Sequence, residues 1–310
     1  MKKICAITGG NGYVGGCLKN FLAAHGWEIF EFSRRPRPGS RAFQFQLGDD
    51  VSPDLLSGVT AFVHCAWDFA PLRWKEINAV NIEGARKILH AARAANVPKI
   101  VFISSISAYE GCRSLYGRAK LQIEKIAIAH GALVVRPGLV YGGLAGGMFG
   151  KLAEKIRKSS ITPLAGGGSQ VQYLIHHEDL CAFIEKFASG AVETPPCLVT
   201  AANEQPWRFK DLIREIAAAR GKKPAFIPLP WRALWLALKS AELCGLKLNF
   251  RSDSLVSLMY QNPEPDFSAN ARLGLVCRPF NGRQLTRETT SAGRQAANQQ
   301  PNPPQRSHGP

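Results

Sequence analysis

The sequence contains no apolar run long enough to cross a membrane. In its 310 residues we find no stretch of about 18 consecutive apolar residues. Met1-Lys-Lys matches the start of a signal peptide, but glycines and Asn11 interrupt the apolar run that follows. We therefore expect neither a signal peptide nor an integral membrane segment.

Closely spaced cysteines are also missing. The eight cysteines stand apart from one another without a CxxC pair, and most lie in apolar runs, where a thiol serves as a small buried hydrophobic group. This spacing argues against a disulfide framework and favours a reducing compartment. We predict a cytoplasmic protein.

Acidic residues are scarce relative to basic ones. The chain has 23 Asp and Glu against 39 Lys and Arg, which gives a formal net charge of +16. Such an excess occurs in proteins that bind nucleic acid or anionic membranes, and in enzymes with anionic cofactors and substrates. Because the basic residues are scattered and no nucleic-acid-binding motif occurs, we favour the enzyme and expect no nucleic-acid partner.

Apolar strand patterns alternate with helical patterns up to about residue 135. Such alternation predicts an α/β fold with a doubly wound parallel sheet, which binds ligands beyond the carboxyl ends of its strands. The strands are expected at 3–7, 28–32, 43–46, 60–64, 100–104 and 132–135, and the helices at 13–25, 52–57, 74–95 and 114–130.

The pattern becomes less regular after Tyr141. Glycine-rich loops flank a basic helix at 149–158, and further helices are expected near 207–220 and 230–245. The second of these combines apolar and basic residues, as helices on membrane surfaces do. We favour the alternative that it caps a substrate pocket or packs into a small domain. Residues 282–310, rich in Gln, Asn, Pro, Ser and Arg, predict a disordered basic and polar tail.

The most informative segment is Ile4-Cys-Ala-Ile-Thr-Gly-Gly-Asn-Gly-Tyr-Val-Gly15. A short apolar strand ends at Thr8, and Gly9, Gly12 and Gly15 then recur at three-residue spacing where a helix begins. Glycine lets the backbone take positive φ and approach a ligand closely. The free N–H groups at the helix start favour a phosphate.

Two further patterns carry polar chemistry. Tyr116-Gly-Arg-Ala-Lys120 places a tyrosine and a lysine on one helix face. A nearby ammonium favours the phenolate and lowers the tyrosine pKa, so that Tyr116 can exchange a proton with a hydroxyl or carbonyl group. The apolar strand before Ser104 and Ser105 places these hydroxyls on the ligand side of the sheet.

Together these patterns resemble the extended short-chain dehydrogenases/reductases of the NAD-dependent epimerase/dehydratase type. The resemblance covers about residues 3–280, with motifs in the same order. The glycine segment resembles the family's TGxxGxxG, and Tyr116 and Lys120 fall on its catalytic pair. The other matching segments are Gly48-Asp49, Val63-His-Cys-Ala66, Asn81-Ile-Glu-Gly84, Phe102-Ile-Ser-Ser-Ile-Ser-Ala-Tyr109, Arg136-Pro-Gly-Leu-Val-Tyr-Gly142 and His176-His-Glu-Asp179.

The resemblance implies a Rossmann-type domain that binds NAD(P), in residues 1–165 with parts of 166–205. A small C-terminal α/β substrate domain would lie mainly in 206–281. Tyr116 would be the acid/base, Lys120 would hold the nicotinamide ribose and lower the Tyr116 pKa, and Ser105 would bind the substrate oxygen. The implied cofactor-binding residues are Gly9, Gly12, Tyr13, Val14, Gly15, Ser33, Arg34, Arg35, Asp49, Cys65, Ala66, Asn81, Ser104, Lys120, Pro137 and Gly138.

The resemblance further implies structural roles for His64, His176 and His177, and we predict no metal. A homodimer through the helices near 74–95 and 114–130 is a family expectation.

The end of the second strand departs from the pattern of NAD users. They commonly place an acidic residue there to bind the ribose diol. Here Ser33 occupies that place and is followed by Arg34 and Arg35. Because guanidinium groups bind phosphate well, we favour NADP over NAD.

The substrate region departs as well. The loop between Ser105 and Tyr116 is shorter than in sugar-nucleotide epimerases and dehydratases, and Gln172 stands where those enzymes carry a diphosphate-binding arginine. Arg251 is a candidate replacement for that charge. We predict substrate contacts at Ser105, Tyr116, Gln172 and Arg251.

The leading hypothesis is an NAD(P)-dependent oxidoreductase or epimerase that acts on a nucleotide-linked sugar. The short loop and Gln172 favour the alternative of an NADPH-dependent carbonyl reductase with a non-sugar substrate. A cofactor-binding subunit without catalysis is a further alternative, which the intact set of Ser105, Tyr116 and Lys120 opposes.

Overall fold

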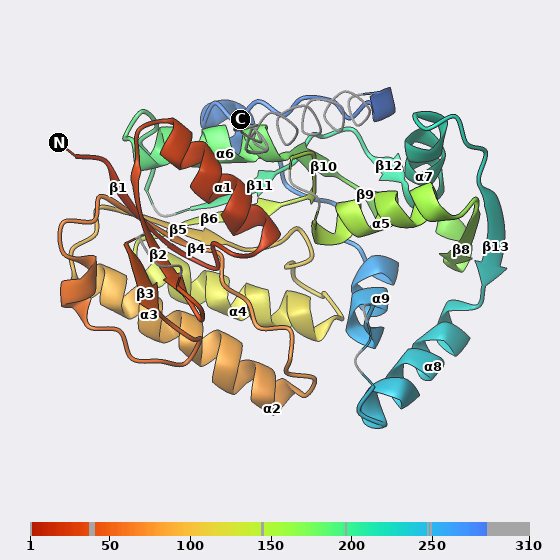
Figure 1. Cartoon of the computed structure of the whole chain (residues 1–310), viewed down its shortest axis with the longest axis horizontal. Helices are drawn as coiled ribbons and strands as arrows, with labels where there is room; N and C mark the ends of the chain where they lie inside the picture. Colours follow the sequence, from red (N-terminus) through yellow and green to blue (C-terminus); the bar gives the residue numbers. More distant parts are fainter. Residues whose placement is uncertain are drawn as a thin grey trace, which may run out of the picture.

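A seven-stranded sheet in the order β11-β6-β5-β4-β1-β2-β3 forms the centre of the molecule (Figure 1). All its neighbouring strands run parallel. The computed structural model describes residues 2–36, 41–143, 146–195, 197–246, 248 and 250–283. The strands are β1 Ile4–Thr8, β2 Glu28–Ser33, β3 Ala42–Gln44, β4 Ala61–His64, β5 Lys99–Ile103, β6 Leu133–Pro137 and β11 Leu198–Ala201. The order reverses between β1 and β4, and the predicted doubly wound Rossmann-type sheet is confirmed.

Helices cover both faces of this sheet (Figure 1). On one face lie α1 (Tyr13–Ala24) and α6 (His177–Ala188), and on the other α3 (Glu83–Ala94) and α4 (Leu115–Ala129). Successive strand residues alternate between the faces, and both faces are apolar because both are buried. In β4, for example, Val63 belongs to the α1–α6 core and Phe62 to the α3–α4 core.

The helix expected at 74–95 consists of three parts. It begins as α2 (Trp74–Ile77), passes through a π-helical turn at Asn78–Ile82 and continues as α3. Such π turns often mark functional positions. This turn contains Asn81, which is buried.

A smaller part stands beside the sheet and has its own core. Phe149, Ile156 and Leu164 pack there with Leu212 and Ile216. Residues 147–165, which the prediction assigns to the cofactor-binding domain, thus pack against 209–218. The elements of this part are β7 Leu139–Tyr141, α5 Gly147–Lys158, β8 Ile161–Ala165, β9 Val171–Gln172, β10 Leu174–His176, β12 Trp207–Arg208, α7 Phe209–Ala218 and β13 Ala225–Leu229.

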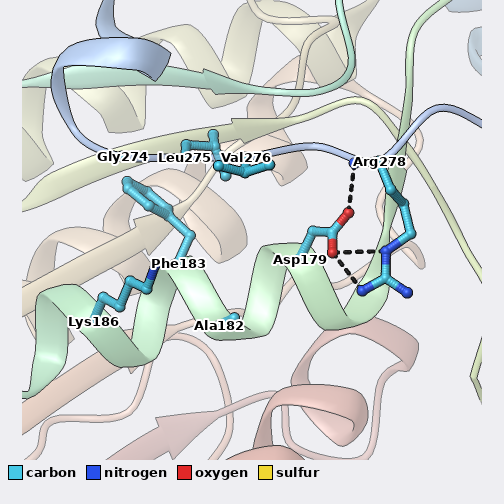
Figure 2. A pocket seen from close by; sticks show the side chains of 8 residues that line it. All are labelled: Asp179, Ala182, Phe183, Lys186, Gly274, Leu275, Val276 and Arg278. Carbon is cyan, nitrogen blue, oxygen red and sulfur yellow. Dashed lines mark hydrogen bonds and ion pairs between the residues drawn. The ribbon is translucent and has the colours of Figure 1, made fainter.

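The chain then forms α8 (Trp231–Leu243), α9 (Ser252–Met259) and α10 (Ser268–Arg272) before it returns to the sheet. Ala269, Leu273 and Leu275 belong to the α1–α6 core. Figure 2 shows the hollow that α6 and residues 274–278 enclose. There the Asp179 carboxylate accepts hydrogen bonds from the backbone N–H and the guanidinium of Arg278. This hollow lies on the α6 face of the sheet, whereas α4 with Tyr116 lies on the other.

Most of the predicted tail, residues 284–310, lies outside the described residues. All eight cysteines are described, and all are free thiols. Within the described ranges, no helix has the length and apolarity that a membrane crossing requires.

Candidate active site

The glycine turn between β1 and α1 lies directly against the end of β4. Gly9 has a φ of 72°, and a Cβ at this position would come within 2.7 Å of the Ala66 nitrogen. A Cβ on Gly15 would collide with the Gly9 carbonyl oxygen, to which the Gly12 N–H donates at 2.9 Å. The turn therefore forms a cradle without side chains at the start of α1, and it fits the diphosphate of a dinucleotide.

A buried hydrogen-bonded group fixes this turn to β4. Thr8 Oγ1 lies 2.7 Å from His64 Nδ1 and accepts the N–H groups of Cys65 and Ala66 at 3.2 and 3.3 Å. The His64 ring stacks against Phe102. Burial lowers the pKa of His64 to about 3, so this histidine is neutral near neutral pH. Burial also raises the pKa of the Cys65 thiol to about 12.

Asn81 holds the loop that follows β4. Its Oδ1 accepts the Asp68 N–H at 2.8 Å, and its Nδ2 donates to the Asp68 carbonyl at 3.0 Å. The structure thus gives Asn81, predicted as a cofactor residue, a role in shaping this loop. Asp49, another predicted cofactor residue, is exposed and accepts the Gln46 N–H in the turn after β3.

The N–H groups at the start of α4 donate hydrogen bonds to two side chains. Ser114 Oγ accepts the Gly117 N–H at 3.1 Å, as an N-cap residue does. From α9, the Asp253 carboxylate accepts the N–H of Leu115 at 2.7 Å and that of Tyr116 at 3.0 Å. Asp253 thereby fixes the backbone of the predicted catalytic tyrosine. No sequence pattern indicates this role of Asp253, because it lies 137 positions from Tyr116 in the chain.

Ser105, Tyr116 and Lys120 come together as predicted. The side chain of Tyr116 is hydrogen-bonded to that of Ser105. Lys120 Nζ donates to the Ile103 carbonyl at 2.8 Å and lies 5.9 Å from the centre of the Tyr116 ring. Burial lowers the pKa of Lys120 to about 8.

The pKa of Tyr116 moves opposite to the predicted direction. Burial raises it to about 12 and outweighs the lowering by the hydrogen bond with Ser105. The centre of the Trp67 ring lies 4.9 Å from that of Tyr116, and the centre of the Phe69 ring lies 6.3 Å away. The loop after β4 therefore supplies an aromatic wall that keeps Tyr116 protonated.

A buried ion pair lies one helical turn beyond Lys120. Glu124 accepts two hydrogen bonds from the Arg136 guanidinium, at 2.8 and 2.6 Å, and one from Ser104 Oγ at 2.5 Å. Ser104, predicted as a cofactor residue, belongs to this cluster. Through these hydrogen bonds Glu124 connects α4 to β6 and to the residue that follows β5, next to the Ser105–Tyr116–Lys120 group.

Other predicted cofactor residues lie at the ends of the strands. Pro137 accepts the Ile106 N–H through its carbonyl at 3.0 Å, and the following Gly138 donates to Ala201 at 3.0 Å. Tyr13, the first residue of α1, donates its hydroxyl to the Gly142 carbonyl at 2.5 Å. Val14, next to it, packs against the α1–α6 core.

The end of β2 presents a buried hydroxyl and two exposed cations. Ser33 is buried, and its Oγ finds no hydrogen-bond partner among the residues that the structure describes. Arg34 and Arg35 follow it and are exposed. The nearest carboxylate of the strand, Glu31, binds Lys19 Nζ at 2.7 Å.

Two of the residues predicted to contact the substrate, Gln172 and Arg251, are hydrogen-bonded within the protein. Gln172 is buried in β9, and its Nε2 donates to the Val171 carbonyl at 2.9 Å. The Arg251 guanidinium donates to the carbonyls of Phe69 and Pro71. Arg251 therefore supports the loop that carries the aromatic wall.

A Rossmann-type sheet with a glycine cradle and a grouped Ser, Tyr and Lys defines a nucleotide-cofactor-dependent oxidoreductase. The model of the NAD dependent epimerase/dehydratase family matches residues 5–195, and the chain belongs to this family. The predicted family and the prediction that the chain is an NAD(P)-dependent enzyme are thereby confirmed.

Similar proteins differ in their substrates. A ceramide reductase of Caulobacter vibrioides is 31% identical in an alignment of 241 residues that covers 73% of this chain and 74% of that protein. A 3 beta-hydroxysteroid dehydrogenase/Delta 5-->4-isomerase of Mycobacterium tuberculosis is 26% identical over 212 residues, and the match spans only 57% of that protein. Among solved structures, MoeE5 in complex with UDP-glucuronic acid and NAD shares the fold, with a TM-score of 0.72, 19% identity and coverage of 94% of this chain and 99% of that one.

Proposed function

We propose that the protein is an NAD(P)-dependent oxidoreductase that interconverts a ketone and a secondary alcohol on an apolar, lipid-like substrate. The observation that carries this proposal is the aromatic wall of Trp67 and Phe69 beside Tyr116. Phe69 is 63% exposed although it stacks against the tyrosine, so it offers an apolar contact surface. The similarity to a ceramide reductase and to hydroxysteroid dehydrogenases supports the same substrate class.

The predicted nucleotide-sugar substrate finds less support. A diphosphate is best bound by a guanidinium with free donors. Gln172 carries no charge, and the guanidinium of Arg251 already donates to the carbonyls of Phe69 and Pro71, which leaves it fewer N–H donors for a diphosphate. We therefore place the non-sugar carbonyl compound ahead of the nucleotide sugar.

The protonation state of Tyr116 favours reduction. When bound, NAD(P) supplies or accepts the hydride. Because its pKa is about 12, Tyr116 carries its proton near neutral pH and can give it to the oxygen of a carbonyl group that is being reduced. Ser105 orients the tyrosine hydroxyl and the substrate oxygen. Lys120, with its pKa lowered to about 8, is ready to return a proton to the tyrosine.

We further propose NADP as the preferred cofactor. Ser33 provides a buried hydroxyl at the end of β2, and Arg34 and Arg35 provide exposed guanidinium groups for a 2′-phosphate. Glu31 is paired with Lys19, so this carboxylate is not free for a ribose diol.

The test measures NADPH and NADH oxidation by the purified chain with a long-chain 3-ketolipid, a ketosteroid and a panel of UDP-sugars. We expect turnover of a lipid-like ketone with NADPH. Tyr116→Phe should lower kcat by about 10²- to 10⁴-fold and leave NADPH binding, followed by fluorescence, unchanged. Tyr173→Phe, in a tyrosine outside the site, is the matched control. Turnover of UDP-sugars alone, or full activity of Tyr116→Phe, would contradict the proposal.

A further inference from the structure

Helix α8 is apolar on the side that it turns toward solvent. Its inward positions include Trp231, Leu234 and Trp235, which are partly buried. Leu236 and Leu243 on the outer side are 61% and 72% exposed. The exposed face consists of Arg232, Ala233, Leu236, Ala237, Ser240 and Leu243. Large apolar side chains on both sides of a helix are typical of a helix that another surface covers, so the exposed leucines make the outward face of α8 a candidate contact surface.

The apolar surface continues past the end of the helix. Leu246 is 60% exposed and Phe250 is 38% exposed. With its 13 residues α8 is too short to span a bilayer, which needs about 20. It is long enough to lie along a bilayer surface with its leucines among the acyl chains.

The charge of the residues around α8 indicates which kind of surface could bind its outward face. Between Arg220 and Arg251 the sequence has seven lysines and arginines and a single carboxylate, Glu242. Glu242 is buried, where it accepts the N–H and the hydroxyl of Ser252. This segment therefore presents positive charge beside exposed leucines, a combination that anionic lipid headgroups attract.

Helix α8 is also joined to the candidate active site. Trp231 packs edge-on against Tyr260, with ring centres 5.8 Å apart, and Tyr260 accepts the hydroxyl of Tyr109 from the loop between Ser105 and Tyr116. In Figure 1, α9 lies between α8 and the end of α4 that carries Tyr116. A surface that covered α8 would thus lie close to the substrate side of the enzyme.

We propose that α8 is an interfacial helix that docks this protein on an anionic lipid bilayer through its outward face. This inference goes beyond the proposed function, because the helix would hold the enzyme on the bilayer with or without a bound substrate.

The test is flotation of the full chain with vesicles, without cofactor or substrate. We expect binding to vesicles of phosphatidylcholine and phosphatidylglycerol in equal amounts, weaker binding at high salt, and little binding to phosphatidylcholine alone. The double variant Leu236→Gln/Leu243→Gln should bind at least about tenfold more weakly. Arg232→Gln should bind about fivefold more weakly.

The control variant is Val276→Gln, since Val276 is 79% exposed on the α6 side. It should bind like the unaltered chain, and all variants should keep their thermal midpoint because the changed side chains are exposed. Absence of binding to anionic vesicles would overturn the proposal. Undiminished binding of the leucine variant would overturn it too, as would a dimer in vesicle-free solution that this variant dissociates. Because no turnover is measured, these results do not depend on the substrate assay.

Discussion

Replacement of His64 should change how the stability of the protein depends on pH. The unfolded chain protonates this histidine below about pH 6.5, whereas the folded protein does so only below about pH 3. Between these two values the unfolded state binds the extra proton, so acid favours unfolding. The contribution of a neutral His64 is therefore present in full above pH 6.5 and is lost as the pH falls toward 3.

The size of the effect follows from the two pKa values. The gap between 6.5 and about 3 corresponds to roughly 5 kcal/mol over the whole window, at about 1.4 kcal/mol for each pH unit. Between about pH 6.5 and about pH 5, roughly 2 kcal/mol of this is lost. His64→Asn keeps a hydrogen-bonding group near Thr8 Oγ1 but does not titrate in this window, so its stability should fall less steeply.

Urea unfolding followed by tryptophan fluorescence measures this difference. The free energy of unfolding of both proteins is compared at about pH 7, pH 6 and pH 5, and the gap between them should narrow by roughly 2 kcal/mol as the pH falls. His25→Asn, in an exposed histidine, gives the reference for losing an imidazole elsewhere. A gap that stays constant over this range would refute the reasoning, because the buried histidine would then titrate alike in both states.

Substitutions at three further positions test the contacts around the site. Asp253→Ala removes the acceptor for the N–H groups of Leu115 and Tyr116. We expect the free energy of unfolding, measured in urea, to fall by about 1–3 kcal/mol, and kcat to change more than KM. Asp253→Asn keeps an acceptor oxygen and should restore part of the lost stability and part of the lost kcat. Glu124→Gln breaks the buried pair with Arg136 and should cost about 3–5 kcal/mol of unfolding free energy, also measured in urea. Gly9→Ala places a Cβ against Ala66 and should weaken NADPH binding about tenfold or more in a fluorescence titration.

The part of the site that the sequence predicts well is local. The glycine spacing and the four-residue step from Tyr116 to Lys120 each lie within one turn or helix, so their geometry follows from the backbone period. The same holds for the strands predicted at 3–7, 60–64, 100–104 and 132–135, whose apolar runs are largely buried, whereas β3 at the edge of the sheet is only partly buried.

What the sequence does not predict depends on contacts between distant segments. Burial raises the pKa of Tyr116. Trp67 and Phe69, whose rings pack against it, lie almost fifty residues earlier in the chain, and no local pattern indicates that they meet. Asp253 reaches Tyr116 from 137 positions away. The packing of 147–165 against 209–218 is likewise a property of the folded chain. Strand β11 has only four residues and follows a proline pair, too short a signal to predict a strand.

The long reach of Asp253 has a consequence for the order in which the protein matures during synthesis. Chains are made from the N-terminus, and their early segments begin to fold first. A nascent chain that ends before α9 already contains the glycine cradle and Ser105, Tyr116 and Lys120, yet the first N–H groups of α4 still lack their carboxylate partner. The start of α4 therefore acquires the hydrogen bonds that fix the Tyr116 backbone only after α9 has been made.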